Sequence, residues 1–210
     1  MKESFVSLYL GMRGAGKSYL VKEYELKKYK RILIYDTQGE YIDGIVFEEL
    51  EELKKFWLQH YQGAFKIIYR PLNHVNFSAI CDLVYTCGNM CFVVEELDLT
   101  AGTFDTDINF QSIIKRGRHK NITFIGISQR PFGINRNITS QAKIIYSFRQ
   151  LEPRDVEYLK YFIGVEAEQI PNLKKYHFLY WNYNIDVTRM MTYNAKTKTI
   201  IPVVKIAEKT

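Results

Sequence analysis

The sequence lacks the features that mark several classes of protein. None of its 210 residues lie in an apolar run of about 18 or more, so no membrane-spanning helix is predicted. The apolar stretch near the N-terminus stops at Gly11, and we expect no processed leader. The three cysteines, Cys81, Cys87 and Cys91, show no paired C-x-x-C spacing, which argues against a zinc site. These absences predict a soluble protein of the cytoplasm with reduced core thiols and no membrane insertion.

Linkers and repeats are also absent. No internal repeat, low-complexity tract or segment rich in Pro, Gly or Ser divides the chain. A content of 47% hydrophobic and 25% charged residues is ordinary for a globular protein. We therefore expect one domain over 1–210, with a core at about 4–165 and a C-terminal extension at about 166–210. The formal net charge of +6 suits an anionic partner such as nucleic acid.

Apolar runs of strand length alternate with longer stretches of helical period. This alternation predicts an α/β fold with a mostly parallel sheet flanked by helices. The predicted strands cover 5–10, 31–35, 45–47, 65–69, 91–94, 122–127 and 143–148. The predicted helices cover 17–28, 48–60, 77–87, 104–116 and 153–162. The tail at 176–204 alternates apolar and polar residues, which favours a terminal hairpin or an added edge strand.

The most specific motif is G-x-x-x-x-G-K-S between the first strand and the first helix. It comprises Gly11, Met12, Arg13, Gly14, Ala15, Gly16, Lys17 and Ser18, and Tyr19 follows it. The glycines let backbone N–H groups approach phosphate oxygens closely. Lys17 reaches the β- and γ-phosphates, and the Ser18 hydroxyl binds magnesium. The motif therefore predicts a P-loop that binds ATP with Mg²⁺.

Two carboxylates follow the apolar run that begins at Met90. Glu95 and Glu96 come directly after this strand, in the manner of a Walker B motif. We assign Glu95 to the magnesium shell and Glu96 to the general base that activates water. Because the first acid of such a pair is usually Asp, the longer Glu95 departs from the common pattern. Asp98 is the main competitor for either role.

A basic cluster and a Ser-Gln pair flank the next strand. The helix before the strand ends in Lys115 and Arg116, and Arg118, His119 and Lys120 follow. The strand then runs into Ser128-Gln129-Arg130-Pro131. An amide at the tip of this strand, Gln129, can hydrogen-bond the γ-phosphate or the attacking water.

With these residues the sequence resembles the FtsK/HerA superfamily of ring-forming, DNA-pumping ATPases. The resemblance covers about 5–149 and includes the turn at 36–41, which is similar to one in HerA-type members. It implies a RecA-like core, a pentameric or hexameric ring and ATP-driven movement of double-stranded DNA. By position Gln129 matches the polar sensor of that family, and Arg116 and Arg118 are candidates for the arginine finger. The alternatives for the finger are Arg130, Arg136 and Arg149.

DNA contacts are expected mainly from the basic cluster. Lys115, Arg118, His119 and Lys120 would contact phosphates without sequence preference. One residue cannot easily serve as both finger and DNA contact. The loop at 100–103, after the two carboxylates, is an alternative lining for a pore.

The compact chain is similar in size to viral genome-packaging ATPases. This resemblance implies a motor that pumps duplex DNA into a preformed capsid and meets a portal or capsid-vertex protein. Two alternatives are a plasmid or mobile-element DNA translocase and a virion assembly or export factor of the Zot type. Zot-type proteins normally have a membrane-spanning stretch, which this sequence lacks. A small-molecule kinase is a further alternative, but kinases of this architecture usually carry an arginine-rich lid.

Overall fold

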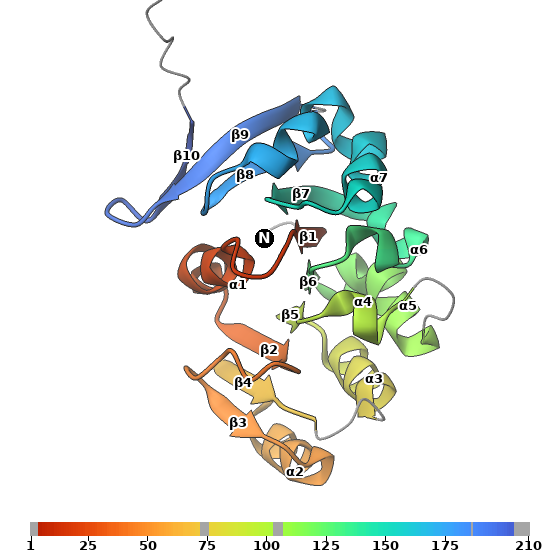
Figure 1. The fold of residues 1–210 in the computed structure, drawn as a ribbon. Coiled ribbons are helices and arrows are strands. Elements are labelled where there is room, and N and C mark those ends of the chain that lie inside the picture. Colours follow the sequence, from red (N-terminus) through yellow and green to blue (C-terminus); the bar gives the residue numbers. More distant parts are fainter. Residues whose placement is uncertain (1–3, 72–75, 103–106, 186, 204–210) are drawn as a thin grey trace, which may run out of the picture.

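One ten-stranded sheet organises the chain in the computed structural model, which describes residues 4–71, 76–102, 107–185 and 187–203 (Figure 1). The strand order is β10-β9-β8-β7-β1-β6-β5-β2-β4-β3. The strands are β1 Val6–Leu10, β2 Arg31–Tyr35, β3 Ile45–Phe47, β4 Phe65–Tyr69, β5 Met90–Val94, β6 Ile122–Ser128, β7 Ala142–Phe148, β8 His177–Asn182, β9 Val187–Asn194 and β10 Thr199–Pro202. All pairings from β7 through β3 are parallel. The predicted α/β fold and its strands are therefore confirmed.

The helices and helical turns are shorter and more varied than the predicted set. The α-helices are α1 Lys17–Leu20, α2 Leu50–His60, α3 Phe77–Cys87, α4 Leu97–Thr100, α5 Ile108–Arg116, α6 Arg136–Thr139 and α7 Pro153–Ile163. The other helical segments are η1 Val21–Glu25, η2 Leu26–Lys28, η4 Gly117–Lys120, η5 Pro131–Gly133 and η6 Gly164–Asn172. The predicted helix at 17–28 is helical throughout, but it changes from α to π in η1 and to 3-10 in η2. Sequence period alone did not predict α4, α6 or η6.

Both faces of the central strands are covered. Every residue of β1, β5 and β6 is buried, as expected for parallel strands between two helical layers. One core cluster joins alternate sheet residues to α2, α3, α5 and α7, and the second joins the others to α1, η1 and η2 (Figure 1). The two layers hold the strands in a fixed register, so the loops at the strand ends have defined positions.

The start of α5 shows how a local sequence signal fixes a boundary. The Asp107 carboxylate accepts hydrogen bonds from the backbone N–H groups of Asn109 and Phe110, at 2.9 and 3.0 Å. This cap satisfies two N–H groups that would otherwise lack a partner in the first turn. The predicted helix at 104–116 therefore begins at Ile108 instead, and residues 103–106 lie outside the described residues.

The C-terminal segment extends the sheet with the opposite strand polarity. β8 pairs antiparallel with β7, and β9 and β10 continue as antiparallel neighbours. The expected hairpin and edge addition at 176–204 is thus confirmed in its described part. Within the residues that the structure describes, no helix has both the length and the apolar character to cross a membrane.

Candidate nucleotide-binding site

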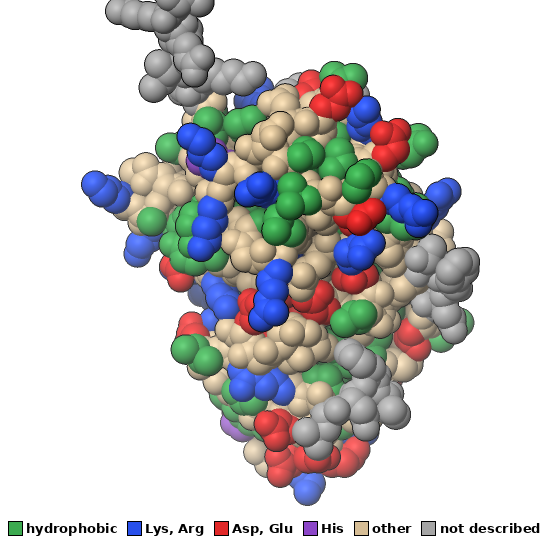
Figure 2. Space-filling view, viewed as in Figure 1, with side chains coloured by type: hydrophobic (Ala, Val, Ile, Leu, Met, Phe, Trp, Pro, Cys, Tyr) green, Lys and Arg blue, Asp and Glu red, His purple; other side chains and the backbone are tan. Residues whose placement is uncertain are grey.

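Three loops from distant parts of the sequence meet at the carboxyl edge of the sheet. β1 leads into the P-loop, β5 leads into Glu95 and Glu96, and β6 leads into Gln129. These strands are neighbours in the order β5-β6-β1, with parallel register. In open parallel sheets the crevice outside the carboxyl ends of the strands is the usual ligand site. Figure 2 shows lysine, arginine and acidic side chains close to one another near the centre of the face, over the carboxyl edge of the sheet.

The P-loop has the backbone conformation that its glycines permit. Gly14 and Gly16 have φ values of 76° and 113°, in the left-handed region that other residues rarely adopt. The Gly11 N–H donates to the Ser128 carbonyl at 3.2 Å, and the Met12 N–H donates to the Arg149 carbonyl at 2.8 Å. The loop is therefore anchored to the ends of β6 and β7 before any ligand binds.

Lys17 lies inside the loop and faces the two acids. Its Nζ donates to the carbonyl oxygens of Gly11 and Met12, at 2.7 and 3.1 Å. Burial lowers the pKa of Lys17, while the charges of Glu96 and Glu95 oppose that shift. The amine is thus a desolvated positive charge that lines the same pocket as two carboxylates.

Glu95 is the more deeply buried of the two acids. Its side chain is 3% exposed and its Oε1 accepts a hydrogen bond from the Tyr41 hydroxyl at 2.8 Å. Burial raises the pKa of Glu95 to about 7, although hydrogen bonds from Tyr41 and Ser18 favour its ionised form. Mg²⁺ prefers oxygen ligands and takes only a few from protein, with phosphates and water completing its shell. The adjacent Ser18 hydroxyl and Glu95 carboxylate fit that requirement.

Glu96 points toward the tip of β6. Its Oε1 accepts a hydrogen bond from Gln129 Nε2 at 2.5 Å, and burial raises its pKa. Its backbone φ of 48° is in the left-handed region, an arrangement that costs a non-glycine residue on the order of 1–3 kcal/mol. This turn aims adjacent carboxylates at different partners, since Glu95 contacts Tyr41 and Ser18 whereas Glu96 contacts Gln129.

Asp98 occupies a different place from the two glutamates. Its Oδ1 accepts a hydrogen bond from the Ser128 hydroxyl at 2.5 Å. Within the described chain it is not among the side chains that line the pocket next to Lys17. The geometry therefore favours Glu96 over Asp98 as the acid that faces a bound nucleotide.

These groups line one pocket of about 320 Å³. It is lined by Arg13, Gly14, Gly16, Lys17, Ser18, Tyr19, Gln38, Glu40, Glu95, Glu96, Gln129, Lys175 and Tyr176. Gly11, Met12 and Ala15 shape the loop without lining the pocket. Sequence reasoning did not assign Gln38, Glu40, Lys175 or Tyr176 to the site. The turn at 36–41 offered a signal for the first two, but nothing local in the sequence links Lys175 and Tyr176 to a loop some 160 residues away.

The first two finger candidates, Arg116 and Arg118, and the DNA-contact candidates lie at the opposite, amino edge of the sheet. Lys115 and Arg116 end α5, and Arg118, His119 and Lys120 form η4 just before β6 begins; all five are exposed. Within one chain the structure does not bring them to the pocket. Arg116 donates to the Ser112 hydroxyl at 2.9 Å, and Lys115 donates to the Gln111 side chain at 3.2 Å.

The alternative arginines differ in how firmly the chain holds them. Arg130 forms a 3.1 Å ion pair with the buried carboxylate of Asp155, and Arg149 donates to the Pro171 carbonyl at 3.1 Å. Both contacts are within the chain, and both arginines follow the carboxyl ends of strands, Arg130 after β6 and Arg149 after β7. Arg136 begins the short helix α6 and is exposed.

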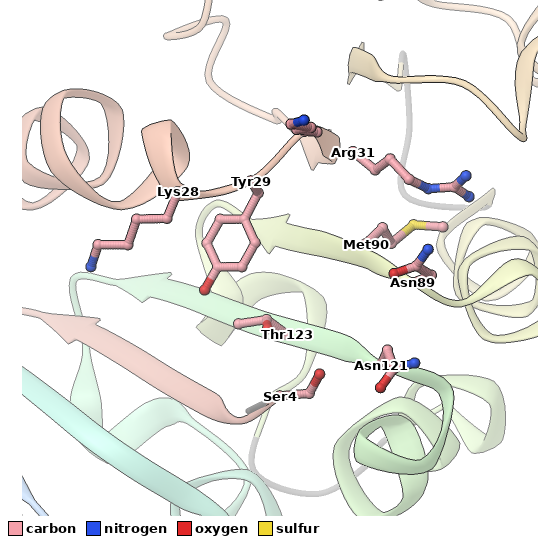
Figure 3. Close-up of a pocket in the computed structure, with 9 residues that line it drawn as sticks. Ser4, Lys28, Tyr29, Arg31, Asn89, Met90, Asn121 and Thr123 are labelled. Carbon is pink, nitrogen blue, oxygen red and sulfur yellow. The ribbon is translucent and has the colours of Figure 1, made fainter. Parts of the chain in front are cut away.

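A second hollow of about 360 Å³ lies at this amino edge (Figure 3). Lys28, Lys30, Arg31, Asn89 and Asn121 line it where β2, β5 and β6 begin. No acidic side chain of the described chain is among its lining residues. The amino-edge hollow is therefore lined by basic and amide groups, whereas the carboxyl-edge pocket combines acids with Arg13, Lys17 and Lys175.

Comparison with known proteins gives sequence and structural relatives. The chain is 24% identical over 197 residues to the DNA packaging ATPase P9 of Enterobacteria phage PRD1, covering 88% of this chain and 85% of that protein. The genome packaging NTPase B204 of Sulfolobus turreted icosahedral virus 2, in complex with AMP, matches with a TM-score of 0.74 and 19% identity over 97% of this chain and 100% of that chain. VirB4 of Thermoanaerobacter pseudethanolicus matches with a TM-score of 0.59 and 12% identity over 89% of each chain. No protein-family model matches.

These findings confirm the resemblance that the motifs indicate. The chain resembles viral genome-packaging P-loop ATPases, and a VirB4 protein is among its structural neighbours. B204 has also been solved with ATP-gammaS, with a TM-score of 0.73 to this chain. The sheet and its flanking helices are accordingly those of a P-loop NTPase.

Proposed function

We propose that this chain is the ATPase of a viral genome-packaging motor, which moves double-stranded DNA into a preformed capsid. One observation carries the proposal: Lys17, Glu95, Glu96 and Gln129 meet in one pocket, in a fold that resembles viral packaging ATPases. A phosphate-binding loop opposite two acids and an amide suits hydrolysis of a terminal phosphate.

Each residue of the pocket has a separate role in hydrolysis. The P-loop amides and Lys17 bind the triphosphate, and Ser18 and Glu95 are the residues that would hold Mg²⁺. When bound, Mg²⁺ neutralises charge on the β- and γ-phosphates. Glu96 accepts a proton from the attacking water, and its raised pKa makes it a stronger base than an exposed glutamate. Gln129, already hydrogen-bonded to Glu96, orients that water.

The amino edge is the proposed contact surface for DNA and for the next subunit. Lys115, Arg118, His119 and Lys120 are exposed, and in the described part of the chain no ion pair with an acid involves any of them. Unpaired surface cations attract phosphates without sequence preference. Arg116, or Arg118 in place of its DNA contact, supplies the arginine finger to a neighbouring subunit of a pentameric or hexameric ring. We place the working protein in the host cytoplasm, next to a portal or capsid-vertex protein.

ATP hydrolysis measured with and without double-stranded DNA, together with sizing of the oligomer in ATP, tests this function. We expect DNA to stimulate hydrolysis, and we expect this stimulation to weaken steeply as salt concentration rises. A ring should form in ATP. Absence of stimulation by any nucleic acid would contradict the motor and favour an assembly factor of the Zot type. Stimulation by DNA without association with procapsids would favour a plasmid or mobile-element translocase.

A further inference from the structure

The segment before β8 reaches back to the nucleotide pocket. Lys175 and Tyr176 line this pocket together with Tyr19, which follows the P-loop. The Tyr176 backbone N–H donates to the Ala15 carbonyl at 3.1 Å, so the C-terminal addition is hydrogen-bonded directly to the P-loop. This contact joins residues that are about 160 positions apart, and the roles assigned above to the P-loop and the acids do not account for it.

Tyr176 adopts a backbone conformation that needs support. Its φ of 66° is in the left-handed region, which is unfavourable for a bulky residue. Its ring occupies space that only a glycine at position 16 leaves free, because a Cβ on Gly16 would lie 2.7 Å from the Tyr176 Cδ1. The Thr192 hydroxyl of β9 donates to the Tyr176 carbonyl at 3.1 Å. The P-loop and β9 thus hold Tyr176 from two sides, in the way that strained residues are held at ligand sites.

Tyr176 and Tyr19 form a wall of aromatic rings beside the loop. Their centroids are 5.2 Å apart with an interplanar angle of 53°, and Tyr193 supports Tyr19 from 5.9 Å. Tyr19 is 40% exposed and Tyr176 is 38% exposed, so each ring has surface available to a ligand. A planar base needs roughly 3.5 Å to each ring that it stacks on. The two rings are therefore too close to admit a base between them, and a base would stack on the open side of the wall.

The polar end of the pocket determines which part of a nucleotide meets this wall. Lys17, Ser18 and the two glutamates hold the phosphate tail and its cation, as proposed above. Among the described residues that line the pocket, Tyr19 and Tyr176 are the aromatic ones. Stacking on aromatic rings is the common, sequence-tolerant way in which proteins bind a nucleobase. The nucleoside end of the ligand consequently belongs at Tyr19 and Tyr176.

Lys175 adds a positive charge to the lining of the same pocket. Its Nζ is 5.1 Å from the centroid of the Tyr176 ring, and no ion pair in the described chain involves it. We propose that Tyr176 and Tyr19 hold the nucleotide base by stacking and that Lys175 contacts the phosphate tail. The C-terminal addition is then part of the nucleotide site. This inference rests on the proposed ATPase function.

Binding of two ligands, measured by calorimetry, separates the base from the phosphates. The ligands are ATP and inorganic tripolyphosphate, each with Mg²⁺, and the proteins are the full chain and its Tyr176→Ala variant. Stacking of a base is worth about 1–3 kcal/mol, so we expect ATP affinity to fall roughly 5- to 150-fold. The affinity for tripolyphosphate, which has no base, should stay within about twofold. Tyr176→Phe keeps the ring and should bind both ligands as the unmodified protein does.

Further variants complete the comparison. Lys175→Ala should weaken the binding of both ligands, because it removes a contact to the phosphates. Tyr183→Ala is the matched control, since Tyr183 is 69% exposed and does not line the nucleotide pocket. If Tyr176→Ala fails to fold, Tyr19→Ala in α1 provides the same test. It should weaken the binding of ATP and leave the binding of tripolyphosphate unchanged.

Two results would overturn the inference. Equal weakening of ATP and tripolyphosphate by Tyr176→Ala would show that Tyr176 only shapes the P-loop, and unchanged ATP binding would remove it from the site. An unmodified protein that binds neither ligand would instead contradict the proposed ATPase function itself. Failure of the subsite and failure of the function are therefore distinguishable.

Discussion

The two edges of the central sheet carry opposite chemistry on the same strands. At the carboxyl edge Glu95 and Glu96 are buried, hydrogen-bonded and raised in pKa. At the amino edge Lys115, Arg118 and Lys120 are exposed to solvent. Desolvated charges interact strongly over short distances and can be tuned for chemistry. Solvated cations interact more weakly and are screened by salt, and several of them together suit contact with a polyanion.

The largest effect is expected from the proposed arginine finger, through which the amino edge of one subunit would act at the carboxyl edge of the next. If Arg116 or Arg118 reaches the next subunit's nucleotide, its change to Ala should lower the rate of hydrolysis about 10³- to 10⁵-fold. Mixing that variant with Glu96→Gln subunits should restore some hydrolysis, because mixed rings contain intact composite sites. Arg154→Ala in α7 is a matched control, since Arg154 is also exposed. Failure of mixing to restore activity would leave the arginine with a role inside its own subunit.

The next largest effect is expected from a change at the carboxyl edge alone. Glu96→Gln should lower the rate of ATP hydrolysis about 10²- to 10⁴-fold, because the amide cannot accept a proton from water. Binding of ATP, measured by calorimetry, should persist. Asp98→Asn is the control, since Asp98 contacts Ser128 and not the pocket. Undiminished hydrolysis in Glu96→Gln, or a larger loss in Asp98→Asn, would reverse the two assignments.

A pH titration of stability tests how strongly the carboxyl edge is desolvated. Without nucleotide or metal, burial raises the pKa of Glu95 from 4.5 to about 7. Between these values the folded protein keeps a proton that the unfolded chain has released, so the free energy of unfolding falls as pH rises from about 4.5 to about 7. The contribution is on the order of 3 kcal/mol.

Urea denaturation at several pH values measures this contribution. Glu95→Gln should flatten the decline in the free energy of unfolding, because its side chain does not titrate. Glu48→Gln, at an exposed position, should leave the decline unchanged. The same pH dependence of the unfolding free energy in the unmodified chain and in Glu95→Gln would contradict the assignment to Glu95.

The smallest effect concerns the amino edge. Changing Lys115 and Lys120 to Ala removes two phosphate contacts and should lower the salt dependence of DNA binding by about two units of slope. The affinity for duplex DNA should fall roughly tenfold at moderate salt. Fluorescence anisotropy with labelled DNA measures both quantities. The control changes Lys54 and Lys55 in α2 to Ala, and an equal loss there would mean that DNA binding follows net charge and not the amino edge.

Much of the fold follows from patterns that act over short stretches of chain. The strand before Gly11, the buried run from Met90 and the strand ending at Ser128 were all predicted within one or two residues. Apolar period and flanking turn residues carry that information locally. The change from α1 to a π turn at Val21 was not predicted, because helices of different type share nearly the same apolar spacing.

The candidate site likewise contains some residues that local motifs predicted and others that they did not. The P-loop, Glu95, Glu96 and Gln129 were assigned from motifs, and the structure brings them to one pocket because parallel strands end at the same edge. Lys175 and Tyr176 were not assigned. Each reaches the site by a turn whose position depends on packing against other parts of the chain, and no spacing in the sequence encodes that contact.

The sequence by itself determined which chemical groups this protein possesses and where its main strands and helices follow one another along the chain. Glycine spacing, apolar period and adjacent acids are local properties, and local interactions fix them. Only the tertiary structure decided that Tyr176 lies against Gly16, that Glu95 is desolvated beneath Tyr41, and that the basic cluster faces away from the acids. Those facts depend on the order of the strands in the sheet and on burial by residues far apart in the chain. No local sequence pattern contains that information.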